Sequence, residues 1–178
     1  KEAQLSLQKV HPGDSTRNTL EFDINIALSS ACLQKMDFDA ALSYIEKARN
    51  VGGNLNLTKL YQNLSILHLV ISEPDMAQEY CRKALESAQT PYDRAVILNN
   101  YAIMCYDQKK YAQALELCQR NQIEIEKIDA AHVKSNLYSI FARIYTDQKN
   151  YKEALRYHQK EQEVLDSVFN KESEERVI

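Results

Sequence analysis

The chain has 178 residues, which is enough for one ordinary domain or one elongated array. It is 44% hydrophobic and 26% charged, a balance that supports a packed core and argues against an unfolded chain. The net charge of -3 is spread over mixed acidic and basic residues, which argues against nucleic-acid binding, and no apolar run reaches the roughly 18 residues of a membrane span.

Helix-breaking residues are few, with 3 Gly and 3 Pro, and Ala, Leu, Gln, Glu and Lys are abundant, which together predict an all-helical protein. Thr90, followed by Pro91 and by Asp93, has the composition of a helix start with a capping side chain. Asp129 is expected to cap the helix after it, and "VGGNLN" from Val51 is the loosest connection. Helices are predicted near residues 15–34, 38–50, 56–71, 74–88, 91–107, 111–127, 130–147 and 151–167.

An internal repeat organises these helices. The stretch "DQKKYAQAL" from Asp107 returns as "DQKNYKEAL" from Asp147. Equivalent alanines are Ala3, Ala41, Ala77, Ala114 and Ala154, at intervals of 38, 36, 37 and 40 residues. Twelve residues before each of the last four there is a small residue, namely Ser29, Ser65, Ala102 and Ala142. Small side chains at matching positions let two antiparallel helices approach closely, so each repeat is expected to be a helical hairpin that stacks on the next.

The repeated stretches "LSSACLQKMDFDAAL", "LSILHLVISEPDMAQ", "YAIMCYDQKKYAQAL" and "FARIYTDQKNYKEAL" resemble the tetratricopeptide repeat family over nearly the whole chain. The resemblance implies an all-α, right-handed α-α superhelix of about four helical hairpins, preceded by an orphan N-terminal helix. The family usually has Ala seven residues after the repeated alanine, which holds for Ala48 and Ala84 but not for Asn121 and Glu161. Together with a spacing above the family's usual 34 residues, this departure predicts longer helices in the last two repeats.

These patterns divide the chain into six segments. Residues 1–14 are expected to be the second helix of a truncated upstream repeat and a linker, and residues 168–178 a charged helical tail leading to a missing region. The four repeats are predicted to span residues 15–55, 56–90, 91–129 and 130–167.

The sequence has no pattern that carries catalysis or binds a cofactor. No paired acid and base, activated nucleophile, phosphate-binding loop or metal motif is present, so the protein is predicted not to be an enzyme and to use no metal or cofactor. The four cysteines, Cys32, Cys81, Cys105 and Cys118, fall at packing positions of the repeat and are expected to be free and buried, or nearly so.

The resemblance implies a concave surface formed by the first helices of the repeats, and this surface is the predicted site for a protein or an extended peptide. Asparagine amides both donate to and accept from a peptide backbone, although Asn63 and Asn100 also fit ordinary repeat positions. Tyr106 is the expected energetic anchor, and Arg143 is expected to select an acidic feature. The predicted groove residues are Lys59, Gln62, Asn63, Ile66, Asn99, Asn100, Ile103, Tyr106, Ser139 and Arg143.

The C-terminal stretch "YHQKEQEVLDSVFNKESEERVI" resembles the end of tetratricopeptide repeat regions in Bacteroidetes signalling proteins and transcriptional regulators, chiefly over Leu165 to Asn170. The resemblance implies the sensory or regulatory part of a larger protein, which could self-associate through its C-terminal continuation. The alternative is a cytoplasmic peptide receptor or scaffold with similar repeats. The compartment, cytoplasmic or periplasmic, and any membrane anchor of the larger protein stay open.

Overall fold

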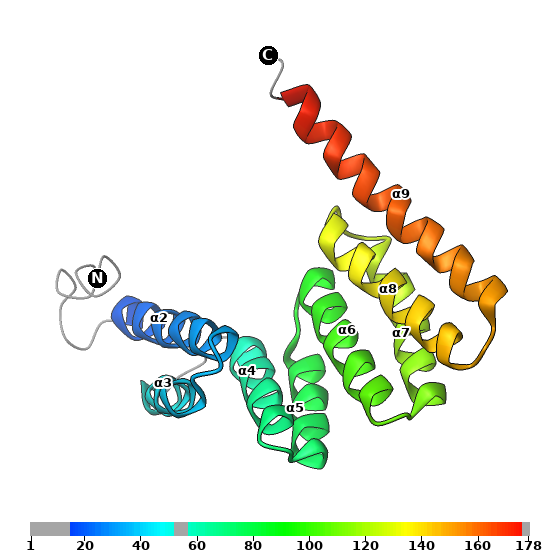
Figure 1. The fold of residues 1–178 in the computed structure, drawn as a ribbon. Helices are drawn as coiled ribbons and strands as arrows, with labels where there is room; N and C mark the ends of the chain where they lie inside the picture. Colours follow the sequence, from blue (N-terminus) through cyan, green and yellow to red (C-terminus); the bar gives the residue numbers. More distant parts are fainter. Residues whose placement is uncertain (1–14, 52–56, 176–178) are drawn as a thin grey trace. The chain divides into compact units, whose positions relative to one another are not determined.

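The computed structural model describes residues 15–51 and 57–175, and all of their regular structure is helical (Figure 1). The all-α prediction is therefore confirmed for this part of the chain, whereas the expected orphan helix and most of "VGGNLN" lie outside the described residues. The helices are α2 (Ser15–Gln34), α3 (Phe38–Val51), α4 (Leu57–Val70), α5 (Pro74–Ser87), α6 (Pro91–Asp107), α7 (Tyr111–Ile125), α8 (Ala131–Asp147) and α9 (Tyr151–Glu175).

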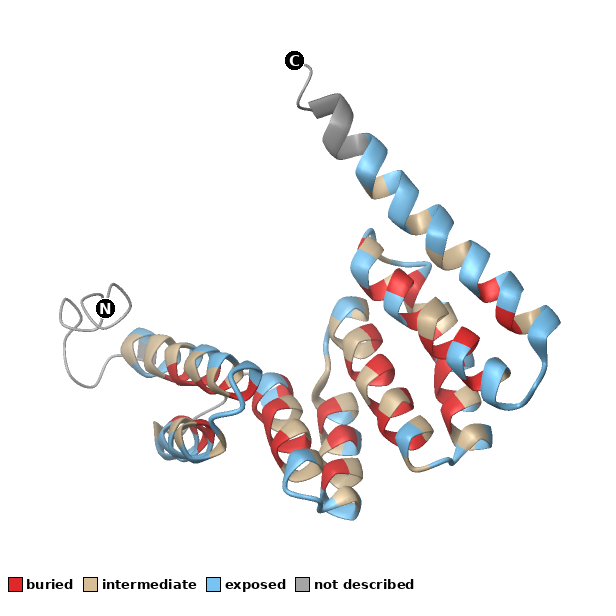
Figure 2. Ribbon diagram, in the orientation of Figure 1, coloured by how far each residue is buried: buried red, intermediate tan, exposed pale blue. Residues whose placement is uncertain are grey.

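The described helices form two compact units, α2 to α5 and α6 to α9. In the first unit α2 pairs with α3 and α4 with α5, while α4 also packs on α2 and α3. In the second unit α6 pairs with α7 and α8 with α9, while α8 also packs on α6 and α7. Each unit is thus two helical hairpins stacked on each other, with buried residues on the facing sides of the paired helices (Figure 2).

The small residues of the repeat lie at the helix crossings, as the spacing predicts. Ala41, Ala77 and Ala114 have no exposed surface, and Ala154 is 4% exposed. Their partners on the first helices, Ser29, Ser65, Ala102 and Ala142, are buried to the same degree. Because a helix pair this close leaves no room for a larger side chain, the positions of these residues determine how each hairpin packs.

A single turn geometry joins the two helices of every hairpin. The residues that take a left-handed backbone conformation are Met36, Ser72, Lys109 and Lys149, with φ between 59° and 65°. In each turn the next backbone N–H returns to a carbonyl five residues earlier, as Lys110 N does to Cys105 O at 2.9 Å and Asn150 N to Tyr145 O at 2.8 Å. This hydrogen bond satisfies a carbonyl that the end of the first helix would otherwise leave free.

Of the two capping residues predicted from the sequence, one caps its helix and the other does not. Thr90 caps α6, because its Oγ1 accepts the N–H of Asp93 at 3.0 Å and Pro91 follows it. Asp129 does not cap α8, which was the expectation. The helix begins one residue later than expected, with Ala130 at the cap position and no side-chain hydrogen bond there.

The prediction of longer helices in the last two repeats holds only in part. Helices α6 and α8 have 17 residues each, α7 has 15 and α9 has 25, compared with 14 in α3, α4 and α5, but α2 in the first repeat has 20. The predicted end of the last helix, near residue 167, was too early. The stretch after it contains Glu, Lys and Ser but no Gly or Pro, so nothing in the local sequence stops the helix.

The four cysteines are free thiols. Cys81, Cys105 and Cys118 are buried and Cys32 is half-buried, which confirms the prediction for these residues. Burial raises the pKa of Cys81 to about 11 and that of Cys118 to about 12. These two thiols therefore stay protonated at neutral pH, which makes them packing residues rather than reactive groups.

Candidate partner-binding surface

The predicted groove residues fall in both units, so each part is described by itself. Lys59, Gln62, Asn63 and Ile66 lie on α4 in the first unit. Asn99, Asn100, Ile103 and Tyr106 lie on α6, and Ser139 and Arg143 on α8, in the second unit.

In the first unit Asn63 is a buried residue that joins two helices by hydrogen bonds. Its side chain is 6% exposed, and its Nδ2 donates to the carbonyl of Ile26 at 3.1 Å and to Ser29 Oγ at 2.5 Å. The amide thereby joins α4 to α2. Lys59 is exposed, and Gln62 and Ile66 are half-buried, so these three side chains remain accessible on α4.

In the second unit Asn99 has a similar internal role. It is 4% exposed, and its Nδ2 donates to the carbonyl of Val133 on α8 at 2.9 Å. The side-chain nitrogen of Asn121, Nδ2, donates to Asn99 Oδ1 at 2.7 Å. The same nitrogen also donates to the carbonyl of Ala95 at 2.8 Å. Two amides therefore tie α7, α6 and α8 together, while the neighbouring Asn100 is half-buried and accessible.

The structure brings together the two residues that the sequence ranked highest for binding. The guanidinium carbon of Arg143 lies 4.3 Å from the centre of the Tyr106 ring, a cation–π contact between α8 and α6. An Arg143 nitrogen is 3.7 Å from Asp107 Oδ1, and 47% of the Arg143 side chain is exposed. The stacking holds the guanidinium in place while leaving part of it open to solvent.

Three further residues complete this cluster. Asp107 stands beside Arg143, and Tyr111 donates its hydroxyl to Asp147 Oδ2 at 3.1 Å. The rings of Tyr106 and Tyr111 are 5.8 Å apart, between centroids. The pKa of Tyr106 is raised chiefly by a hydrogen bond with Asp147. The pKa of Tyr111 is raised chiefly by burial and, to a smaller extent, by its hydrogen bond with Asp147. Both hydroxyls are therefore protonated at neutral pH.

The sequence prediction missed Asp107, Tyr111 and Asp147, although a signal for them existed. The two aspartates begin the stretches "DQKKYAQAL" and "DQKNYKEAL", and Tyr111 is the tyrosine of the first. Because these stretches are the turns between paired helices, the repeat itself places the aspartates at the ends of α6 and α8. We use the name Tyr106–Arg143 surface for these three residues together with Asn100, Ile103, Tyr106, Ser139 and Arg143.

Other kinds of site have little support in the described part of the chain. Within residues 15–51 and 57–175, no three side chains of His, Cys, Asp or Glu gather in a way that would hold a metal ion. None of the described helices combines the length and the apolar character that crossing a bilayer requires.

The paired helices, their buried alanines and the repeated turn are the architecture of stacked helix–turn–helix units. Residues 93–167, which cover most of α6 through α9, match the tetratricopeptide repeat family. These residues are tetratricopeptide repeats, and the first unit has the same arrangement of paired helices. Repeats of this family are protein-interaction modules, and their fold places binding on surfaces between stacked helices rather than in a catalytic centre.

Solved structures have the same fold over most of the chain. A structure reported for the functional characterisation of PilF from Pseudomonas aeruginosa has a TM-score of 0.71 at 23% identity, covering 83% of this chain and 62% of that chain. BtubC from P. vanneervenii has a TM-score of 0.74 at 16% identity, covering 93% of this chain and 71% of that chain. At these identities the likeness concerns the fold alone. No curated protein matches the sequence significantly.

Proposed function

We propose that this protein is a non-catalytic binding module whose second unit holds an extended peptide or partner segment on the Tyr106–Arg143 surface. The observation that carries the proposal is the stacking of Arg143 on Tyr106 at 4.3 Å, with 47% of the arginine side chain still exposed. A guanidinium that is already oriented loses less conformational freedom when it binds a ligand.

The chemistry of this surface favours a partner with an acidic group next to an apolar one. Arginine pairs with carboxylates through two parallel hydrogen bonds, and at 3.7 Å Asp107 makes only a loose ion pair with it. Ile103 and the Tyr106 ring are half-buried and offer apolar contact, while Asn100 adds an amide for a peptide backbone. We also propose that the first unit contacts a partner through the accessible side chains of α4, namely Lys59, Gln62 and Ile66.

The wider context that we propose is the sensory or regulatory part of a larger bacterial signalling protein or transcriptional regulator. The support is the resemblance of Leu165 to Asn170 to the end of such regions, and α9 runs through this segment without a break to Glu175. A cytoplasmic peptide receptor or scaffold is the alternative, because the Tyr106–Arg143 surface needs no output domain to bind a peptide. The sequence of the full-length gene separates the two, through the presence or absence of an output domain.

The binding proposal is tested with an array of extended peptides in which Asp or Glu flanks an apolar residue. Wild type is compared with a Tyr106→Ala/Arg143→Ala double variant, and with a control carrying Tyr151→Ala and Arg120→Ala, two exposed residues of the same types. We expect the first variant to bind the best peptides at least about tenfold more weakly and the control to bind as wild type does. Equal binding by all three proteins would refute the assignment.

A further inference from the structure

The two hairpin turns of the second unit lie close together at one edge of it. Tyr111, which follows the turn between α6 and α7, donates its hydroxyl to Asp147, which precedes the turn between α8 and α9, at 3.1 Å. Arg143, one helical turn before Asp147, has a guanidinium nitrogen 3.7 Å from Asp107 Oδ1, at the end of α6. The turns are therefore continuous with the Tyr106–Arg143 surface.

We use the name turn edge for residues 106–116 and 143–156, which are the helix ends on both sides of the two turns together with the turns themselves. The turn edge is positively charged, although the whole chain has a net charge of -3. It has six cationic and four acidic residues, so its net charge is +2 and that of the rest of the chain is -5. The cations are Lys109, Lys110, Arg143, Lys149, Lys152 and Arg156, and the anions are Asp107, Glu116, Asp147 and Glu153.

Most of the acidic groups at the turn edge already have partners. Asp107 and Glu153 each lie against an arginine, at 3.7 Å and 2.8 Å. Asp147 accepts a tyrosine hydroxyl, and Glu116 lies further along, in the second turn of α7. An acidic partner that approaches the turns therefore meets carboxylates that are partly engaged with groups of the protein itself.

The three lysines of the turns are available to a partner. None of the ion pairs formed among the described residues involves Lys109, Lys110 or Lys149. Lys110 and Lys149 are exposed, and Lys109 is half-buried. The backbone positions of two of them are held by hydrogen bonds, because the N–H of Lys109 donates to the carbonyl of Tyr106 at 2.8 Å and that of Lys149 to Thr146 at 2.9 Å. Each of these two lysines comes two residues after an aspartate of the Tyr106–Arg143 surface.

The apolar part of the Tyr106–Arg143 surface lies on the side away from the turns. Ile103 is about one helical turn before Asp107 on α6, and Asn100 is about two turns before it. The rise from Asn100 to Asp107 is about 10 Å, which an extended segment spans with about three residues. A segment that follows α6 therefore passes the apolar contact first, then Arg143, and then the turn lysines.

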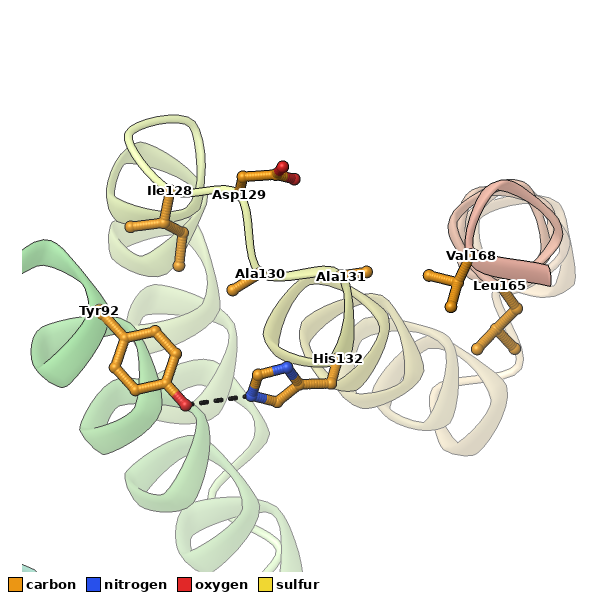
Figure 3. A pocket seen from close by; sticks show the side chains of 8 residues that line it. All are labelled: Tyr92, Ile128, Asp129, Ala130, Ala131, His132, Leu165 and Val168. Atoms are coloured by element: carbon orange, nitrogen blue, oxygen red, sulfur yellow. Dashed lines mark hydrogen bonds between the residues drawn. The ribbon is translucent and has the colours of Figure 1, made fainter. Parts of the chain in front are cut away.

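The opposite end of the second unit differs in character. A pocket of about 610 Å³ lies there, with mostly apolar walls that come from the turn before α8 and from the second half of α9 (Figure 3). Its one polar pair is self-contained, because the Tyr92 hydroxyl lies 3.1 Å from His132 Nε2. Lys134 belongs to this end of α8, so it offers a cation far along the helix from the turn edge.

We propose that the partner segment carries a run of acidic residues, and that this run crosses the turn edge at Lys109 and Lys149. The inference rests on the function proposed for the Tyr106–Arg143 surface and adds the order of the partner's residues. An apolar residue contacts Ile103, an acidic residue binds Arg143, and one or two further acidic residues lie at the turns. Opposite charges across an interface guide association and select the orientation of the partner.

The test uses three fluorescein-labelled peptides that share one leucine and carry one, two or three Asp residues on the same side of it. Each peptide is also made in the reverse order, and binding to the full chain is followed by fluorescence anisotropy. Lys109→Asn/Lys149→Asn removes two turn cations, and asparagine tolerates the left-handed backbone at φ of 60° and 59°. Arg120→Gln/Lys134→Gln is the control, because it removes the same charge from helix positions outside the turn edge.

We expect wild type to bind at least about twofold more tightly with each added Asp, in one of the two peptide orders. Lys109→Asn/Lys149→Asn should lose this gain and still bind the one-Asp peptide within about twofold of wild type. The control should keep the gain. Added salt should weaken binding of the three-Asp peptide more than that of the one-Asp peptide. Circular dichroism verifies that each variant is folded.

The outcomes separate this inference from the function on which it rests. If added Asp residues bring no gain, or if Lys109→Asn/Lys149→Asn keeps it, the acidic run is refuted, while weaker binding by Tyr106→Ala/Arg143→Ala would still support the surface. An equal loss of the gain in the control would also refute the run, because it would reveal a general effect of net charge. Equal binding by wild type and Tyr106→Ala/Arg143→Ala, or no binding of any peptide, would refute both.

Discussion

Asn121 on α7 donates its side-chain amide to Asn99 Oδ1 on α6, at 2.7 Å, in the interior of the second unit. Asn121 has no exposed surface and stands where the first two repeats have Ala48 and Ala84. A position that only fills space in those two repeats therefore carries a hydrogen bond here. The bond continues through Asn99 to the carbonyl of Val133, so it links three helices.

Removal of this amide should destabilise the second unit. Asn121→Ala leaves Asn99 Oδ1 and the carbonyl of Ala95 without their donor, and we expect a loss of about 1–3 kcal/mol in the free energy of unfolding. A double-mutant cycle with Asn99→Ala should show a coupling of about 0.5–3 kcal/mol, measured by urea denaturation. Gln119→Ala, at an exposed position of α7, is the control. A coupling of zero would mean that the two amides act independently.

The left-handed residues of the turns offer a stabilising substitution. Lys149 has φ of 59°, which is unfavourable for any residue with a Cβ, so Lys149→Gly should stabilise the protein by about 0.5–1 kcal/mol. Lys152→Gly, in the first turn of α9, should instead cost about 0.5–1 kcal/mol, because glycine is a poor helix former. Thermal melts of the two variants should shift in opposite directions, and a shift in the same direction would contradict the turn geometry.

The helix crossings should not accept larger side chains. Ala102→Leu and Ala142→Leu should each cost about 1–3 kcal/mol, because both alanines have no exposed surface. Phe141→Ala should cost about 3–5 kcal/mol, since the ring is fully buried and stacks on Tyr157 at 4.2 Å. Leu155→Ala, at an exposed position, should change stability by no more than about 0.5 kcal/mol. Unchanged melting temperatures in the three core variants would show that the assigned packing is wrong.

The thiols should separate into two classes. Cys32 is half-buried and should react first with a thiol reagent, whereas the other three should react only when the protein opens. For Cys81 and Cys118 the folded pKa, about 11 and about 12, lies above the usual value of 9.0. The folded state therefore favours the protonated thiol, and its contribution to stability is present below pH 9.0 and is lost as pH rises from there. Labelling at pH 8 with and without denaturant tests the classes, and rapid labelling of two or more native thiols would contradict them.

The C-terminal turns of α9 should contribute little to folding. Residues 164–170 include no buried side chain, so removal of residues 171–178 is expected to leave the melting temperature within about 1–2 °C of the full chain. A large decrease would show that this end of α9 stabilises the hairpin it forms with α8.

The local sequence was sufficient to predict the hairpins. Side-chain size at Ala114 and Ala102 limits how near two helices can come, and the spacing between such residues along the chain equals the length of a repeat. The start of α6 could also be predicted from the local sequence, because the capping residue Thr90 and its hydrogen-bond partner Asp93 are only three residues apart. The same reasoning failed for Asp129, because a capping residue type does not by itself decide whether the backbone enters the helix at that residue.

The tertiary structure decided which neighbouring residue is free to bind. Asn99 and Asn100 are adjacent and chemically identical, yet α8 packs against the first and leaves the second accessible. Successive helical residues point about 100° apart, so only the position of the next hairpin selects between them. The pocket is likewise made of Tyr92, the turn before α8 and Leu165, which are far apart in sequence. The sequence by itself therefore determined the repeat and its hairpins through short-range size and spacing, whereas the binding surfaces depend on the stacking of one hairpin on another.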